Sequence, residues 1–189
     1  KESTEELAFE ILEKQWDTSS YRNQRTKENQ DKAKSKDMVQ TYMEWEKNNP
    51  NTPVDVESKF RIKINDVTIS GMIDRVEKTP EGEYEVIDFK TGYAYKNKNT
   101  IKEDVQMNIY ALGTQKLYGK LPKKTSLFYI KDNKLVPHFI EKETLDEFTK
   151  SLGDKIDDIF DEKFDALPEF RKCSRCDYAS ICDAKESVN

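Results

Sequence analysis

The hydrophobic residues of the chain recur with two different spacings, and their order predicts helices toward both ends with strands between them. Apolar residues three or four positions apart predict helices over residues 7–16, 36–46, 102–118 and 145–160. The polar run of residues 22–37 contains no glycine or proline, so we expect it to form the solvated first half of one long helix whose second half, residues 36–46, packs. Alternating apolar and polar residues predict strands over residues 54–64, 69–76, 84–89, 125–130 and 134–140. We therefore expect an α/β fold in which helices pack on a strand-rich centre.

Proline and asparagine residues mark the breaks between these elements. The run from Asn48 to Pro53 predicts a loop that separates an N-terminal helical segment, residues 1–53, from a core of residues 54–189. With 189 residues, the two parts are expected to form one compact domain. Pro137 cannot donate a ladder hydrogen bond, so the last strand is expected at an edge of the sheet.

Residues 71–92 predict a β-hairpin, because two strand-like runs flank the turn residues Thr79-Pro80-Glu81-Gly82. An acidic residue interrupts each run, Asp74 in the first strand and Asp88 in the second, and Lys90 follows. Side chains two positions apart on a strand lie on the same face, so Asp88 and Lys90 point the same way. Two carboxylates and an ammonium group can therefore converge.

This convergence has a chemical interpretation. Carboxylate oxygens suit Mg²⁺ or Mn²⁺ better than zinc. A divalent ion held by Asp74 and Asp88 can polarise a phosphodiester and activate water, while Lys90 stabilises the developing charge or orients the water. The predicted reaction is metal-dependent hydrolysis of nucleic acid. The alternative is that Asp88 and Lys90 are a solvent-facing pair on an amphipathic strand.

The neighbouring residues add a resemblance to a known family. Three motifs carry it: Gly71-x-x-Asp74-Arg75, the run from Glu85 to Gly92, and Gln106-x-x-x-Tyr110 on the following helix. Together they resemble the PD-(D/E)XK nucleases, specifically the RecB-like branch with its helicase–nuclease domains and CRISPR-associated iron–sulfur exonucleases. The resemblance covers residues 54–182. It implies a three-layer α/β/α restriction-endonuclease-like core with a mixed central sheet.

The resemblance also implies roles for individual residues. Asp74 and Asp88 would be catalytic and would bind the metal together with the backbone carbonyl of Phe89, and Lys90 would be the catalytic lysine. The residues that it implies for positioning DNA are Gln106 and Tyr110. A glutamine and a tyrosine four residues apart lie on one helix face, so the alternative is a buried pair that only satisfies itself.

Two further features of the sequence, Glu57 and residues 93–100, each allow two interpretations. Glu57 loosely matches an acidic position that the family often has on the preceding strand, so it either assists metal binding or is an exposed glutamate paired with Lys59 or Arg61. Residues 93–100 have no periodicity and predict a loop. That loop either contacts a DNA backbone through its lysines and stacks a tyrosine on a base, or it is a mobile surface loop.

The charge balance restricts how DNA could bind. Charged residues make up 37% of the chain and the net charge is −5, whereas nucleic-acid binders usually carry a basic footprint. A local basic rim would suffice, and its candidates are Arg61, Lys63, Arg75, Lys96, Lys98 and Lys102. The sequence contains neither a membrane-spanning apolar run nor an evident leader, so we expect a cytoplasmic protein without a membrane partner.

The three cysteines of the chain, Cys173, Cys176 and Cys182, lie close together near its C-terminus. Such clustering favours a metal or an iron–sulfur cluster over disulfides. The spacing resembles the terminal motif of RecB-like nucleases that hold a structural [4Fe–4S] cluster with a distant fourth cysteine. This sequence has neither that cysteine nor the family's upstream histidine, so we expect it to be a fragment of a longer parent in which the cluster is complete. Zinc with a distant ligand and free thiols are the alternatives.

These features together predict a divalent-metal-dependent deoxyribonuclease, more specifically an exonuclease. The expected context is a helicase–nuclease of DNA recombination and repair, with DNA and the helicase domains as partners. A phosphate-binding G-x-x-x-x-G-K-[ST] loop does not occur in this sequence, so any motor would lie elsewhere. The alternative function is a catalytically incomplete nuclease-fold module that binds DNA or a partner protein.

Overall fold

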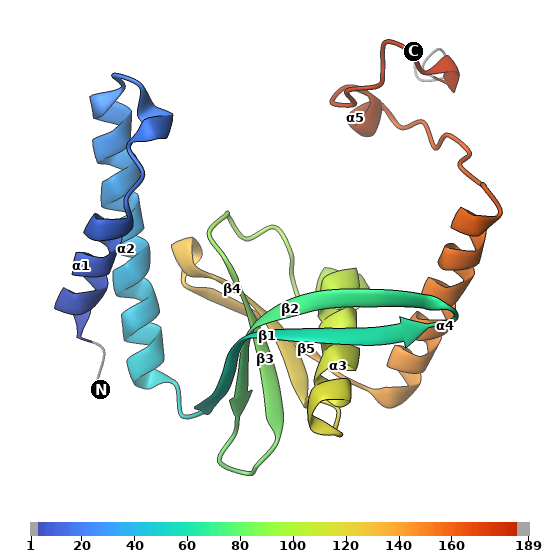
Figure 1. Ribbon diagram of the computed structural model, residues 1–189, viewed down its shortest axis with the longest axis horizontal. Coiled ribbons are helices and arrows are strands. Elements are labelled where there is room, and N and C mark those ends of the chain that lie inside the picture. The colour runs from blue at the N-terminus through green and yellow to red at the C-terminus, as the bar shows by residue number, and fades with distance from the viewer. Residues whose placement is uncertain (1–3, 185–189) are drawn as a thin grey trace. The chain divides into compact units, whose positions relative to one another are not determined.

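One mixed sheet of five strands occupies the centre of the first part of the chain, as the computed structural model of residues 4–184 shows (Figure 1). The strands, in their order across the sheet, are β1 (Thr52–Ile64), β2 (Val67–Lys78), β3 (Tyr84–Lys90), β4 (Lys124–Tyr129) and β5 (Lys134–Phe139). Neighbouring strands are antiparallel except for β3 and β4, which are parallel. The expected mixed sheet is confirmed, and Pro137 lies on the edge strand β5 as predicted.

The helices follow the predicted order. They are α1 (Glu5–Gln15), α2 (Arg25–Asn48), α3 (Val105–Tyr118), α4 (Lys142–Phe160) and the short α5 (Phe170–Cys173), with single 3₁₀ turns η1 (Ser19–Tyr21), η2 (Thr100–Glu103) and η3 (Ile130–Asp132). Thr4 is the N-cap of α1, because its hydroxyl accepts a hydrogen bond of 3.2 Å from the Leu7 amide. Among residues 4–184, no helix combines the length and the apolar character needed to cross a membrane.

The chain divides into two compact units, residues 1–148 and 149–189. The first unit holds the whole sheet and helices α1 to α3, and the second holds α5 and the cysteines. Helix α4 crosses the boundary between them. The expected division at residue 53 stays a prediction.

Helix α2 covers one face of the sheet with aromatic side chains. Trp45 lies 5.0 Å from Phe128 and 5.9 Å from Phe89 between ring centroids, and Tyr42 lies 5.4 Å from Phe89. Phe89 meets both helix rings edge to face, and such pairs attract one another beyond the burial of their apolar area. The second half of the helix therefore packs on the sheet, as the return of apolar residues there predicts.

Helix α3 covers the opposite face, and the fit depends on Phe60 of β1. The Phe60 ring is 3% exposed and meets the Tyr110 ring edge to face. It also lies so close to Gly71 of β2 and Gly113 of α3 that a Cβ atom on either would be less than 3.0 Å from it. Helices on both faces of the sheet confirm the expected three-layer α/β/α core.

A buried ionic network lies beneath α2. Arg75 of β2 is 3% exposed, and its Nε lies 2.6 Å from Glu77 while its Nη1 lies 2.7 Å from Glu46. Nη1 also donates to the Tyr42 hydroxyl at 2.9 Å. Burial lowers the pKa of Arg75, but the neighbouring carboxylates outweigh it, and the net shift is upward. The expectation that Arg75 belongs to a basic rim is therefore wrong.

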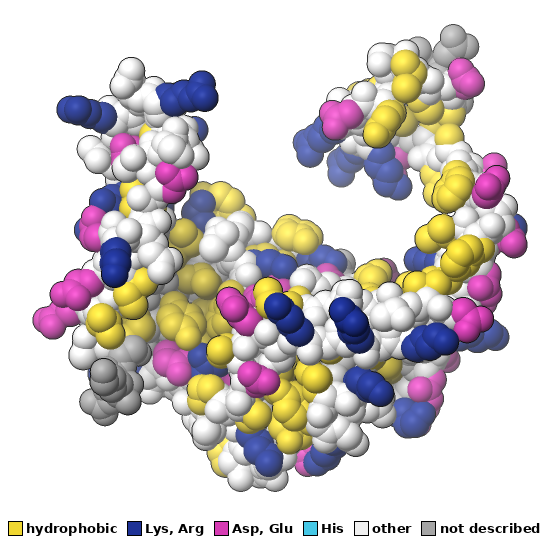
Figure 2. All heavy atoms as spheres, in the orientation of Figure 1, with side chains coloured by type: hydrophobic (Ala, Val, Ile, Leu, Met, Phe, Trp, Pro, Cys, Tyr) yellow, Lys and Arg dark blue, Asp and Glu magenta, His cyan; other side chains and the backbone are white. Residues whose placement is uncertain are grey.

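Strand β1 is less regular than predicted at its start. Ser58, Phe60, Ile62 and Ile64 alternate as buried residues, but Val54 and Val56 are exposed. The alternation fails where the register with β2 shifts between Pro53 and Asp55 and where Glu57 has a left-handed φ of 52°. The exposed alternate positions of the regular part carry basic residues such as Arg61 and Lys63, and Figure 2 shows dark-blue side chains over the β1–β2 hairpin.

The close contact at Gly71 predicts a specific loss of stability. Gly71→Ala would place its Cβ 2.6 Å from Phe60 Cζ, and overpacking of this kind costs about 1–3 kcal/mol. Chemical denaturation measures the cost. Gly92→Ala, where no atom lies within 4 Å of the new Cβ, is the matched control and should change stability by less than about 0.5 kcal/mol. Adding Phe60→Leu to Gly71→Ala should recover part of the loss, and an additive double mutant would contradict the steric explanation.

Candidate active site

Successive side chains of β3 point to opposite faces of the sheet, so one face carries the residue that packs and the other carries the charged residues. Phe89 points toward α2, where it contacts Tyr42 and Trp45. Asp88 and Lys90 point to the opposite face, where Lys90 reaches a residue of α3. The aromatic contacts of Phe89 fix the rotation of the strand, so they also fix the direction of both charged side chains.

Asp74 of β2 lies beside this pair. In the β2–β3 register Arg75 faces Ile87, so Asp74 and Asp88 occupy the next position of the two strands. The Asp74 carboxylate accepts a hydrogen bond of 2.9 Å from the Phe89 amide, which holds it against β3. The predicted convergence of two carboxylates and one lysine is therefore present in the structure.

Asp88 is the most deeply buried charged group of the site. Its side chain is 2% exposed, and Lys90 Nζ lies 2.7 Å from Oδ2 as an ion pair, although Oδ2 accepts no hydrogen bond of good geometry. Burial raises the pKa of Asp88 more than Lys90 lowers it, and the negative charge of Asp74 raises it further. The pKa of Lys90 is lowered by burial, but the carboxylate of Asp88 outweighs this and leaves it above its usual value.

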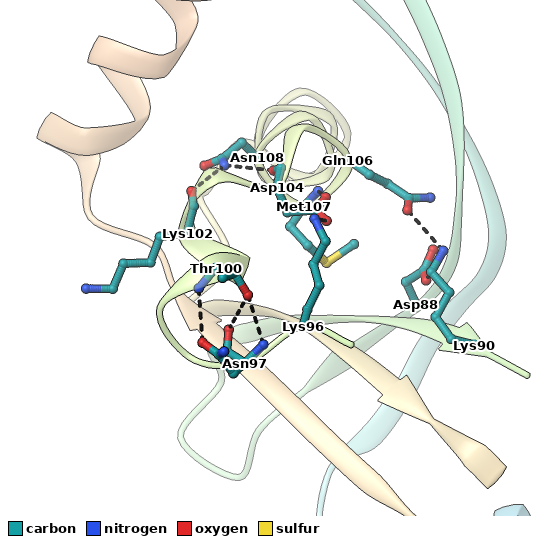
Figure 3. Close-up of polar contacts among 10 residues, drawn as sticks. All are labelled: Asp88, Lys90, Lys96, Asn97, Thr100, Lys102, Asp104, Gln106, Met107 and Asn108. Carbon is teal, nitrogen blue, oxygen red and sulfur yellow. Dashed lines mark hydrogen bonds and ion pairs between the residues drawn. The ribbon is translucent and has the colours of Figure 1, made fainter. Parts of the chain in front are cut away.

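A short hydrogen-bond chain continues from Lys90 to α3. Lys90 Nζ donates to Gln106 Oε1 at 3.0 Å, and Gln106 Nε2 donates to the Tyr110 hydroxyl at 2.9 Å. Figure 3 shows Gln106 extending from the helix toward Lys90 and Asp88. Gln106 and Tyr110 thus hydrogen-bond to one another, as the structural alternative predicts, but Gln106 also accepts a hydrogen bond from Lys90.

Glu57 lies further from the centre of the candidate site than Asp74 and Asp88 do. Counting along the β1–β2 register, in which Val56 faces Arg75 and Ser58 faces Ile73, places Glu57 opposite Asp74. Its side chain is exposed and its φ of 52° is in the left-handed region, which non-glycine residues seldom adopt. A role for Glu57 in metal binding stays a prediction.

The loop between β3 and α3 is tied to the site through Asp104, a residue that the sequence interpretation missed. Asp104 caps α3 by accepting from the Met107 amide at 3.1 Å, and its Oδ2 lies 2.5 Å from Lys96 Nζ (Figure 3). An aspartate directly before the first apolar residue of a helix is an N-cap signal, so the sequence could have shown it. Because Lys96 is paired here, it is a poor candidate for the basic rim.

The residues that would hold a divalent ion are Asp74 and Asp88. Mg²⁺ is usually bound by one or two carboxylates and otherwise by water and substrate phosphates, so two carboxylates suffice. The buried Asp88 Oδ2 accepts no hydrogen bond of good geometry and is paired with Lys90 Nζ at 2.7 Å, so a divalent ion bound there would compete with Lys90 for this oxygen. Within residues 4–184, no group of three or more His, Cys, Asp and Glu side chains is arranged to hold a metal.

The cysteines do not form a cluster site in the described residues. Cys173 ends α5, Cys176 and Cys182 follow it, and all three are free thiols. An iron–sulfur cluster normally takes four thiolates, and these three are not gathered into a metal-binding group. The residues present are one thiolate short of a [4Fe–4S] cluster, and the expected cluster in a longer parent stays a prediction.

The fold defines the class of this protein, because its mixed sheet with a helix layer on each face is of the restriction-endonuclease-like type. A model of the PD-(D/E)XK nuclease superfamily matches residues 1–183. The chain belongs to this superfamily.

Two curated phage proteins are similar to part of the chain. The "Gene 69 protein" of Mycobacterium phage D29 is 30% identical over 133 residues, which is 67% of this chain and 47% of that protein. The protein of the same name from Mycobacterium phage L5 is 29% identical over 133 residues, 67% of this chain and 43% of that protein. The matched region spans less than half the length of these relatives. A solved structure entitled "Crystal structure of SSO0001" is 16% identical with a TM-score of 0.42, covering 88% of this chain and 78% of that one.

The two roles of Asp104 predict different effects of two substitutions. Asp104→Ala removes both the helix cap and the partner of Lys96, so it should destabilise the protein by about 1–2 kcal/mol. Asp104→Asn keeps a capping oxygen and loses only the charge, so most of the stability should remain. Thermal unfolding of both variants measures the difference. Equal losses would show that the cap contributes nothing.

Proposed function

We propose that this protein is a divalent-metal-dependent deoxyribonuclease whose catalytic residues are Asp74, Asp88 and Lys90. The observation that carries the proposal is the buried Asp88 carboxylate, which has Lys90 at 2.7 Å and Asp74 on the adjacent strand. A carboxylate that is 2% exposed is costly unless a cation neutralises it. In a fold of the nuclease superfamily, this arrangement supports hydrolysis of phosphodiesters.

Each residue has a role that follows from its contacts. Asp74 and Asp88 would hold the cation, and the family resemblance implies the Phe89 carbonyl as a further ligand. The bound cation would supply Lewis-acid chemistry by polarising a phosphate and lowering the pKa of water. The ammonium of Lys90, held by Gln106 at 3.0 Å, stabilises negative charge that develops on the phosphate. Gln106 and Tyr110 keep Lys90 directed and position the substrate.

The second candidate function is a nuclease-fold module that binds DNA or a partner protein without cleaving it. It is favoured by one observation, that only two carboxylates gather at the site within the described residues. In this case Lys90 is a permanent counter-ion of Asp88 rather than a catalytic group. The two functions differ in what happens when Lys90 is removed.

We further propose that the protein is an exonuclease of the RecB-like branch and acts within a helicase–nuclease in DNA recombination and repair. The Gly71-x-x-Asp74-Arg75 and Gln106-x-x-x-Tyr110 motifs support the branch. The cysteines contribute no step to this activity.

Cleavage assays test the activity itself. The protein should degrade end-labelled linear DNA with Mg²⁺ or Mn²⁺ and lose this activity in EDTA, and a covalently closed circle should resist an exonuclease. Lys90→Ala should slow cleavage by about 100-fold or more, because it removes a positioned charge from the transition state. Lys116→Ala, an exposed lysine of α3, is the matched control and should cleave at the wild-type rate. Cleavage by Lys90→Ala at an unchanged rate would exclude Lys90 as a catalytic residue.

Metal binding can be measured separately from cleavage. Titration with Mn²⁺, followed by the electron paramagnetic resonance of the free ion, should show weaker binding by about 10- to 100-fold for Asp74→Asn and for Asp88→Asn. Each change removes a ligand charge, and Asp88→Asn also leaves the Lys90 ammonium to repel the ion. Asp66→Asn, in the exposed turn between β1 and β2, is the control. Unchanged Mn²⁺ affinity in both site variants would place the metal elsewhere.

A further inference from the structure

The loop that follows Lys90 exposes two tyrosines beside the candidate active site. Tyr93 is 69% exposed and Tyr95 is 76% exposed, and both stand between β3 and the 3₁₀ turn η2. Aromatic side chains that are this exposed contribute little burial energy to the fold. Packing within the protein therefore does not explain why two tyrosines stand here.

The loop backbone that carries these rings is held at several points. The Ala94 amide donates to Asp132 Oδ2 at 2.6 Å, and Lys96 Nζ pairs with Asp104 at 2.5 Å. Asn97 then closes a turn, because its Oδ1 accepts from the Thr100 amide at 3.2 Å (Figure 3). The tyrosines thus alternate with residues whose backbone or side chain makes a hydrogen bond or an ion pair, and these contacts do not test the alternative of a mobile surface loop.

Each ring also contacts neighbouring side chains, and Lys96 Nζ lies 5.9 Å from the centroid of the Tyr95 ring. Tyr95 meets the buried ring of Tyr129 edge to face, with centroids 6.0 Å apart and planes at 76°. Tyr129 is the register partner of Lys90 on β4, so Tyr95 stands next to the catalytic strand position. Lys131 Nζ lies 3.6 Å from the centroid of the Tyr93 ring, above one of its faces.

We propose that Tyr93 and Tyr95 form a stacking platform for the bases of single-stranded DNA and guide the strand to Lys90. This inference rests on the proposed function and names its substrate class. Exposed rings on an anchored backbone lose little freedom when a base stacks on them. Positive charge lies beside them on Lys131 at the Tyr93 ring, with Lys98 and Lys102 exposed further along the loop, and it suits the phosphates that link the bases.

The rings select for single strands. The bases of a duplex are already stacked on one another, so their faces are closed to the tyrosines, whereas an unpaired strand presents every base face. Recognition of phosphates alone would not favour the single strand, because both forms carry them. The platform therefore predicts binding that depends on the bases but tolerates any sequence.

Fluorescence anisotropy with labelled oligo(dT) and with an abasic strand of equal length and charge tests the platform. In EDTA, which prevents metal-dependent cleavage, the wild type should bind oligo(dT) more tightly than the abasic strand. Tyr95→Ala should weaken oligo(dT) binding about 5- to 100-fold and leave the abasic strand unaffected, and Tyr93→Ala should act in the same direction. Tyr95→Phe keeps the ring and should bind like the wild type.

Phe164→Ala is the control, because Phe164 is 71% exposed but lies in the second unit, outside the loop that carries the two tyrosines. The platform is overturned if Tyr95→Ala binds oligo(dT) as tightly as the wild type, if it loses affinity for both strands equally, or if the wild type does not distinguish them. These results are independent of cleavage. A wild type that shows base-dependent binding but cleaves no DNA with Mg²⁺ or Mn²⁺ would instead refute the proposed nuclease activity.

Discussion

Asp88 is a carboxylate almost removed from water, and the arrangement of the site follows from the need to balance its charge. Lys90 provides the balance at 2.7 Å, and Gln106 holds the lysine from the other side at 3.0 Å. Burial still keeps the pKa of Asp88 above its ordinary value, so the balance is incomplete. The proposed divalent ion would add positive charge beside this carboxylate and favour its ionised form.

The packing of the sheet determines where this charge lies. Phe89 fits between the rings of α2, and the period of two then turns its neighbours on β3 toward α3. On that side α3 approaches β1 closely, because Gly71 and Gly113 leave room for the ring of Phe60. The same close approach brings Gln106 within hydrogen-bond distance of Lys90. The packing of the three layers thus determines where the side chains of the site lie.

The sequence predicted much of this fold and the convergence of Asp74, Asp88 and Lys90, because strand alternation and turn chemistry are local properties. It did not predict that Arg75 would be buried, since the ion pair with Glu46 joins β2 to a helix far away in the sequence. The partner of Lys96 was missed for a different reason, because the start of α3 was placed at residue 102 and Asp104 is its cap. The exposure of Val56 depends on a register shift and on the backbone of Glu57, which periodicity does not show.

The most direct test of the central claim is the anomalous diffraction of manganese in crystals of this protein. The account predicts a peak within coordination distance of carboxylate oxygens of both Asp74 and Asp88, with Lys90 Nζ moved away from its contact with Asp88. Such a peak would show that the two carboxylates form one metal site in this fold. Manganese bound at other positions, with Lys90 still paired to Asp88 and no peak between the carboxylates, would contradict the account.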